Sequence, residues 1–321
     1  MSNNSTSTDQ SLASQSDYGY VPTQWICITF LGLFGASTAI HLAEAIYFRI
    51  WWLIPSAVAC GILELTGWAA RTWSSIQPLI LTPYIMQMTT TIIAPTPLIA
   101  TNFLILEELI LLLGPQYSRL SPRIYKWVFL SCDIVSLTVQ AVGGGEASAA
   151  ADGSGNPDDG GHIMLIGIVF QMFTVVVYTI LAIEFFLRVF SDRPARDILV
   201  DARQSRKTAE AKRNPRVKLM IMCLGIMGVF IFIRSIYRTV ELVDGFEGSI
   251  ITTEIWFNIF DGAMIVLAMA TLNVLHPGFL LRHTPYTLAS DTSSVEIQSL
   301  KDRQPETKLI SDSSSVFPSA V

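Results

Sequence analysis

Residues 163–187 read IMLIGIVFQMFTVVVYTILAIEFFL, an apolar run in which Glu184 is the single charged residue. An α-helix rises about 1.5 Å per residue, so about 20 apolar residues cross the roughly 30 Å hydrocarbon core of a bilayer. The run is long enough for that crossing and has polar sequence on both sides. It is therefore predicted to be a transmembrane helix.

Six further stretches of the chain have the same character. Of the 321 residues, 51% are hydrophobic and only 15% are charged, against roughly 25% charged residues in a soluble domain. The sequence therefore predicts an all-α integral membrane protein, a seven-transmembrane-helix bundle over residues 24–282. The predicted spans are residues 24–47, 51–71, 83–113, 124–143, 162–190, 219–240 and 254–275. The two prolines of Ala94-Pro95-Thr96-Pro97 are expected to kink or locally unwind the third span near mid-membrane.

Basic residues predict the orientation of the bundle. Residues 188–218, between the fifth and sixth spans, contain ten Lys and Arg residues, whereas residues 143–161 contain none. Because loops rich in Lys and Arg remain in the cytosol, we expect the N-terminus outside and the C-terminus in the cytosol. The polar tails, residues 1–23 and 283–321, are expected to be disordered, the first extracellular and the second cytosolic.

Polar side chains inside the spans repeat at helical spacing. Glu64, Trp68 and Arg71, for example, share one face of the second span. Since an ionisable group in hydrocarbon costs about 2.5–3.5 kcal/mol, such side chains should face the bundle interior. The predicted orientation places them in the outer half, where we expect them to line a polar ligand-binding cavity. The candidate binding residues are Glu64, Trp68, Arg71, Asp133, Gln140, Gln171, Arg234, Tyr237, Arg238, Glu241, Glu254, Asn258 and Asp261.

The charges of these candidates do not balance. Five acids accompany three arginines, so ion pairing leaves two acids over. The surplus acids either suit a ligand with a cationic head group or are protonated because they are buried. We predict that Glu64, Glu254 and Asp261 contact that head group, while the arginines hold the acids in place. The alternative is that the pairs only fix the register of the helices.

The sequence argues against an enzyme. Its four histidines form neither HxxxH nor HExxH, so the ligands of a membrane zinc hydrolase are missing, and no Walker loop for ATP is present. We therefore expect no catalytic residue, no metal site and no cofactor. Nucleic acid is not an expected partner.

The order of motifs between His41 and Gly278 resembles the Rta-like, or lipid-translocating exporter, family of fungal seven-helix membrane proteins. The matching elements are Glu64-Leu-Thr-Gly-Trp-Ala-Ala-Arg71, Ala94-Pro95, Asp133 with Ser136 and Gln140, Gly143-Gly144-Gly145, Gly167 with Gln171, Arg234-Ser-Ile-Tyr-Arg238 with Glu241 and Gly245, Glu254 with Asp261, and His276-Pro277-Gly278. Two positions depart from the family pattern. Trp68 stands where the family usually has Tyr, and Glu107-Glu108 stands where it usually has Gly-Arg.

The resemblance implies a multi-pass protein of the plasma membrane, or of an endomembrane, that binds and exports amphipathic lipids. Sphingoid bases and aminosterol-like toxins are the implied ligands, and stress or drug resistance is the implied outcome. Some members of the family are linked to porphyrin handling. Two alternatives remain open. One is a seven-helix receptor that signals through a cytosolic partner on residues 188–218, and the other is a scaffold that alters other transporters.

Overall fold

The computed structural model describes residues 15–16, 18–150, 153, 157–196, 202–245 and 248–281. Within them, seven helical segments are long and apolar enough to cross a membrane, which confirms the predicted number of spans. Each overlaps the predicted residues. The segments are Gln24–Phe48, Trp51–Ile76, Leu81–Leu113, Pro122–Ala149, Asp158–Phe190, Pro215–Asp244 and Glu254–Leu280.

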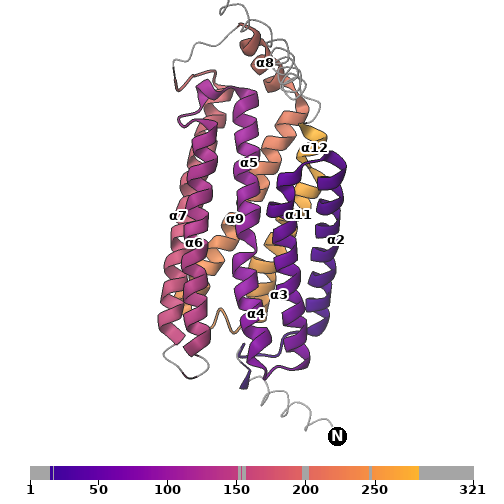
Figure 1. The fold of residues 1–321 in the computed structure, drawn as a ribbon, viewed down its shortest axis with the longest axis vertical. Coiled ribbons are helices and arrows are strands. Elements are labelled where there is room, and N and C mark those ends of the chain that lie inside the picture. Colours follow the sequence, from indigo (N-terminus) through magenta and orange to yellow (C-terminus); the bar gives the residue numbers. More distant parts are fainter. Residues whose placement is uncertain are drawn as a thin grey trace, which may run out of the picture.

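The spans form one elongated bundle (Figure 1). The four that consist of one α-helix each are α2 (Gln24–Phe48), α6 (Pro122–Ala149), α7 (Pro157–Phe190) and α9 (Pro215–Asp244). The short helix α8 (Ala202–Arg213) lies at the end of the bundle opposite the N-terminus. We call these two ends the α8 end and the N-terminal end.

Three spans are interrupted helices. The second joins Trp51–Leu53 and the π-helical Ile54–Val58 to α3 (Ala59–Ile76), and the third is α4 (Leu81–Ile93) followed by α5 (Pro95–Leu113). The seventh consists of α10 (Glu254–Phe257), the π-helical η5 (Asn258–Ala263), α11 (Met264–Val274) and α12 (Pro277–Leu280). Such π-turns are rare and frequently occur at functional sites.

The break in the third span follows from its prolines. Proline has no backbone N–H and its ring clashes with the preceding turn, so Pro95 ends the α4 hydrogen-bond pattern and begins α5. The predicted interruption at Ala94-Pro95 is thereby confirmed. It lies between Thr91 and Thr96, two buried hydroxyl side chains of the bundle interior.

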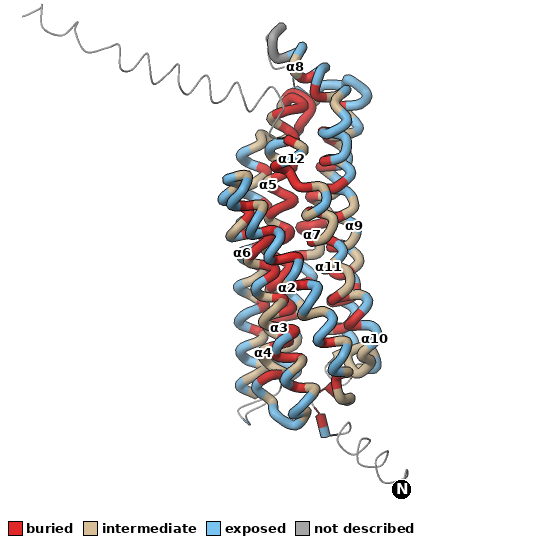
Figure 2. Tube along the Cα trace, turned by 90° about the vertical axis from the view of Figure 1, so that its right-hand side faces the viewer, coloured by how far each residue is buried: buried red, intermediate tan, exposed pale blue. Residues whose placement is uncertain are grey.

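Apolar side chains cover the outside of the bundle and polar ones lie within it. Trp25, Ile166, Phe173 and Val243 are each more than three-fifths exposed, as expected of residues that contact lipid. Figure 2 shows buried residues along the inner faces of the helices. The bundle interior therefore holds the polar groups that the sequence placed inside the spans.

Candidate ligand-binding site

An ion cluster joins α9 to the π-turn η5. Arg238 donates from Nε to Oδ1 of Asp261 at 2.9 Å and from Nη2 to Oδ2 at 2.7 Å. The same guanidinium donates from Nη1 to Glu241 Oε2 at 2.8 Å. All three side chains are almost fully buried. One arginine therefore bridges two acids, with the planar two-pronged geometry that a lysine cannot reproduce.

Arg234 and α4 complete this cluster. Arg234 Nε lies 2.7 Å from Asp261 Oδ1, and its Nη2 donates to the backbone oxygen of Thr91 at 2.6 Å. Arg238 Nη2 also donates to the Thr91 hydroxyl at 3.2 Å. Tyr237 donates its hydroxyl to Glu241 Oε1 at 2.8 Å. Three elements distant in sequence thus meet at one buried polar centre.

A second group surrounds Arg71 on α3. Its Nη2 donates to the Tyr20 hydroxyl at 2.7 Å, its Nη1 donates to Gln87 Oε1 at 3.2 Å, and Glu254 Oε1 lies 3.6 Å away. The Phe257 ring joins the two groups, because its centroid lies 4.5 Å from Arg71 Cζ and 5.2 Å from Arg238 Cζ. Cation–π contacts of this kind are attractive when desolvated.

The chain before α2 takes part in the Arg71 group. Thr23 donates from its backbone N and its hydroxyl to the two oxygens of Glu254, at 2.8 and 2.7 Å. Tyr18 is buried and meets Tyr84 edge-on. Burial raises the pKa of Tyr18 to about 12, so its neutral hydroxyl donates to Ser74 Oγ at 3.3 Å. The N-terminal tail predicted to be disordered covered residues 1–23. In the structure, residues 18–23 pack on the bundle. Residues 1–14 and 17 lie outside the described part of the chain.

A third group connects α6, α7 and α5. Gln140 Nε2 donates to Ser136 Oγ at 2.8 Å and to Gln171 Oε1 at 3.1 Å, and Gln171 Nε2 donates to Thr96 Oγ1 at 3.0 Å. Asp133 is fully buried on the same helix as Gln140. Among the described residues, no hydrogen bond or ion pair links this group to the arginine clusters. Ten of the thirteen predicted residues therefore lie in three polar groups.

Two acids remain after the arginines are paired. Asp261, Glu241 and Glu254 lie beside the three arginines, and this leaves Glu64 and Asp133 as the surplus that the charge count anticipated. Both are almost fully buried, and neither carboxylate has a hydrogen bond of good geometry within the described structure. Glu64 lies near the Trp68 indole and within electrostatic range of Asp261, Arg234 and Arg238, whereas the polar group near Asp133 is the Gln171 amide. A buried carboxylate left in this state carries the full penalty of desolvation.

The remaining predicted residues pack beside the arginine clusters. Trp68 stacks on Phe30 at 4.2 Å between ring centroids. Its indole lies so close to Gly262 that a Cβ there would meet Trp68 Cζ2 at 2.5 Å, so glycine is needed at that π-turn position. Asn258 is buried one turn before Asp261, and its Oδ1 lacks a partner in the described structure.

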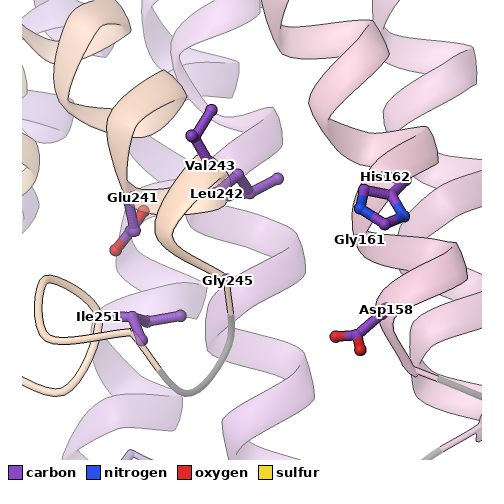
Figure 3. A pocket seen from close by; sticks show the side chains of 8 residues that line it. All are labelled: Asp158, Gly161, His162, Glu241, Leu242, Val243, Gly245 and Ile251. Carbon is purple, nitrogen blue, oxygen red and sulfur yellow. The ribbon is translucent and has the colours of Figure 1, made fainter.

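A small pocket opens at the N-terminal end (Figure 3). It lies between the start of α7, the end of α9 and the chain that follows α9, and Glu241 forms part of its wall. Its volume is about 70 Å³, against roughly 300–1,000 Å³ for a drug-sized site. The pocket is too small for a lipid, and Glu241 is the one member of the ion cluster among its lining residues.

Several residues of these clusters were not among the sequence predictions. They are Tyr20, Thr23, Gln87, Thr91, Thr96 and Phe257. Gln87 and Thr91 carried a signal, because they lie one helical turn apart inside an apolar span. The other four residues carried no signal in the sequence, because their place in the clusters depends on which helix packs against them.

Comparison with known proteins agrees with the motif pattern. Residues 57–284 match the family model described as RTA1 like protein. The sphingoid long-chain base transporter RSB1 of Saccharomyces cerevisiae is 29% identical over 283 residues, 82% of this chain and 74% of that protein. Protein RTA1 of the same yeast is 28% identical over 70% of this chain and 65% of its own length.

Another relative from Saccharomyces cerevisiae, protoporphyrin uptake protein 1, is 29% identical over 69% of this chain and 67% of its own length. No solved structure matches the chain. The family model covers most of the membrane-spanning part, including every candidate residue of the arginine clusters from Glu64 to Asp261. This multi-pass membrane protein therefore belongs to the RTA1-like family.

Proposed function

We propose that this chain binds amphipathic molecules with a cationic head group and moves them across the bilayer. The observation that carries the proposal is Glu64, a central carboxylate that is buried and lacks both an ion pair and a hydrogen bond of good geometry among the described residues. A primary ammonium group would supply both the charge and the donors that this carboxylate lacks. A sphingoid base has such a head group, and a relative is named as a transporter of that lipid class.

The arginine clusters support a step-by-step route for the head group. Asp261 and Glu241 are held by Arg234 and Arg238, and the pocket at the N-terminal end reaches Glu241. An ammonium ion that binds these acids beside the guanidinium groups, without displacing them, would leave no buried charge unpaired. In this route Glu64 and Asp133 bind the head group, while Asp261 and Glu254 remain paired with arginines until it arrives.

We infer that the N-terminal end faces outside and the α8 end faces the cytosol. The support is that Arg49, Arg119, Lys126 and the basic helix α8 all belong to the α8 end. Loops of this charge remain cytosolic. The protein would then reside in the plasma membrane, export its ligand without chemical change to it, and protect the cell from toxic amphiphiles.

Transport by the purified full chain in liposomes tests the proposal. The probe is a fluorescent sphingosine analogue, and its movement between leaflets is followed by quenching from outside. We expect transport well above protein-free vesicles for the wild type and Glu146→Gln, an exposed acid on α6. We expect Glu64→Gln to be at least about tenfold slower, corresponding to about 1.4 kcal/mol. Movement at the protein-free rate with the wild type would refute the proposal.

A receptor is the second candidate function. It is favoured by the contacts that hold α8 against the rest of the bundle. Lys212 on α8 lies 2.7 Å from Asp192 Oδ1 and 4.4 Å from the Tyr117 ring centroid. The backbone N–H groups of Ala195 and Arg196 donate to Gln116 O. These contacts fix a basic surface against α5, where a cytosolic protein could bind. Ligand binding without movement between leaflets would favour this candidate.

A further inference from the structure

Residues 18–23 form a strap across the N-terminal end of the bundle. The Tyr18 hydroxyl donates to Ser74 Oγ of α3 at 3.3 Å, and the Tyr18 ring meets Tyr84 of α4 edge-on, with 4.7 Å between the ring centroids. Thr23, the last residue of the strap, hydrogen-bonds to α10. The strap therefore connects the second, third and seventh spans beside the Arg71 group.

A turn at Gly19 holds the strap against the chain that precedes the seventh span. Gly19 has a φ of +73°, in the region that favours glycine, and its N–H donates to Ser16 O at 2.8 Å. A Cβ at this position would meet Thr252 Cγ2 at 2.8 Å. A larger residue at position 19 would therefore strain the backbone and move the strap away from Thr252.

Thr23 uses its hydroxyl differently from most residues that begin a helix. A threonine at a helix N-cap usually accepts a hydrogen bond from a backbone N–H of the first turn. Thr23 is the N-cap of α2, yet its hydroxyl makes no such bond and instead donates to Glu254 Oε2 at 2.7 Å. Its backbone N–H donates to Glu254 Oε1 at 2.8 Å. One residue thus provides a donor to each oxygen of the carboxylate.

The two donors of Thr23 have the arrangement of a vicinal amino alcohol. The nitrogen is bonded to Cα and the hydroxyl to Cβ, so the donors are on adjacent carbon atoms. An amphiphile with an amine and a hydroxyl on neighbouring carbons can present the same pair to Glu254. Its nitrogen would be an ammonium group, and hydrogen bonds between two ionised partners are stronger than those from a neutral amide. Such a head group can therefore replace Thr23 without loss of a donor.

The surroundings of Glu254 favour this exchange. The Glu254 side chain is 17% exposed, whereas that of Arg71 is 1% exposed. Arg71 donates to Tyr20 and Gln87 and lies 3.6 Å from Glu254 Oε1. Among the described residues, the hydrogen bonds that the Glu254 carboxylate accepts all come from Thr23. Departure of the strap would leave this carboxylate without a donor, which a ligand would then supply.

We propose that Glu254 is a binding site for a vicinal amino alcohol and that Thr23 occupies this site as an internal competitor. The inference rests on the proposed function and adds the class of head group and the segment that closes the site. Sphingosine has this head group, with its amine between two carbons that carry hydroxyls. Octadecylamine has the same charge but no hydroxyl, so it supplies one of the two donor atoms. Glu254 thereby distinguishes amino alcohols from simple amines.

Hydrogen exchange of the full chain in bilayer nanodiscs tests the competition without reference to transport. We expect sphingosine to raise amide exchange in residues 18–23 by at least about tenfold, because it displaces the strap. Octadecylamine at the same mole fraction should raise this exchange far less, and Glu254→Gln should abolish the difference between the two lipids. Equal effects of both lipids on the wild type, or no effect of either, would overturn the proposal.

A weakened strap should bind ligand more tightly. Gly19→Ala strains the turn without changing a binding residue, and Gly32→Ala is the control, because a Cβ at Gly32 meets no atom within 4 Å. Since the ligand binds only when the strap is open, its apparent affinity rises with the open fraction. An increase of about tenfold in the exchange of residues 18–23 without ligand should therefore accompany binding of a fluorescent sphingosine that is about tenfold tighter.

Two substitutions at Thr23 repeat this test through the hydroxyl. Thr23→Val keeps the shape of the side chain but loses one donor, so exchange and affinity should again rise together. Thr23→Ser keeps both donors and should resemble the wild type. Faster exchange with unchanged affinity, in Gly19→Ala or in Thr23→Val, would overturn the competition.

The liposome assay separates this inference from the proposed function. Sphingosine transport by a protein whose strap does not respond to sphingosine would refute the inference alone. Displacement of the strap by sphingosine without movement between leaflets would refute the proposed function and support the site at Glu254.

Discussion

Arg238 and Asp261 form a two-pronged ion pair inside a membrane-spanning bundle, with Nε–Oδ1 and Nη2–Oδ2 distances of 2.9 and 2.7 Å. Asp261 reaches Arg238 from the π-turn η5, so the pair connects an interrupted helix to a continuous one. The same aspartate also lies beside Arg234. The pair therefore holds the seventh span in register with the sixth. It also means that Asp261 already has a cationic partner before any cationic ligand arrives.

Removal of Arg238 should destabilise the protein strongly. Arg238→Gln leaves Asp261 and Glu241 with less compensation in a buried site, and loss of one partner of a buried pair costs about 3–5 kcal/mol. Thermal unfolding in detergent measures the loss. The control is Arg119→Gln, because the Arg119 side chain is 60% exposed and its pair with Glu184 should contribute little. Equal melting temperatures for both variants would contradict the claim that the buried ion cluster stabilises the protein.

Substitution of Glu64 should have the opposite effect on stability. Its carboxylate is buried without a hydrogen bond of good geometry in the described structure. The amide of Gln would also lack a partner, but an unpaired neutral group costs about 1–3 kcal/mol and an unpaired charge costs more, so the substitution relieves part of the penalty. We therefore expect Glu64→Gln to melt higher than the wild type while transport falls. A variant that loses stability and transport together would indicate a structural role for Glu64.

Tyr20 should matter through its hydroxyl. Tyr20→Phe keeps the ring beside Arg71 but removes the acceptor that the guanidinium contacts at 2.7 Å. Hydrogen bonds to charged groups contribute about 1.5–3 kcal/mol, so we expect a lower melting temperature and faster hydrogen exchange in residues 18–23. Tyr47→Phe is the matched control, since Tyr47 is exposed on α2. Equal exchange in both variants would mean that the segment is held by other contacts.

The α8 contact should loosen in acid. The hydrogen bonds from Lys212 and Tyr117 hold the pKa of Asp192 below its usual value. A lowered folded-state pKa contributes stability above the unfolded value of about 3.9, and this is lost as the pH falls through the folded pKa. We expect amide exchange in α8 to rise below about pH 4. Asp192→Asn should show fast exchange at every pH, and acid-independent exchange in the wild type would contradict the assignment.

The sequence predicted the fold because its signal is local. The length of an apolar run such as residues 163–187 is enough to predict a membrane span. The missing N–H of Pro95 is enough to predict a break in the helix. The family assignment was also confirmed, since the spacing from Glu64 to Arg71 and from Arg234 to Arg238 is visible in one chain. Even the two surplus acids could be counted in advance.

Pairing between helices could not be predicted in the same way. The sequence predicted that arginines hold Glu254 and Asp261, but not that Arg71 lies beside the first and Arg238 beside the second, because helix rotation and relative depth decide which charges meet. Tyr20 lies in a polar segment that resembles a solvated tail, and only the neighbouring Arg71 makes it part of a cluster. The predicted tail at residues 283–321 lies outside the described part of the chain.

Photo-crosslinking of a sphingosine analogue in native membranes tests the central claim most directly. With the photoreactive group beside the amine, we predict labelling of the α3 segment around Glu64. Sphingosine should compete for this labelling, the uncharged lipid ceramide should not, and Glu64→Gln should lose it while Glu146→Gln keeps it. Labelling confined to lipid-facing side chains such as Ile62, or labelling that ceramide displaces equally well, would contradict a carboxylate-based site for a cationic head group.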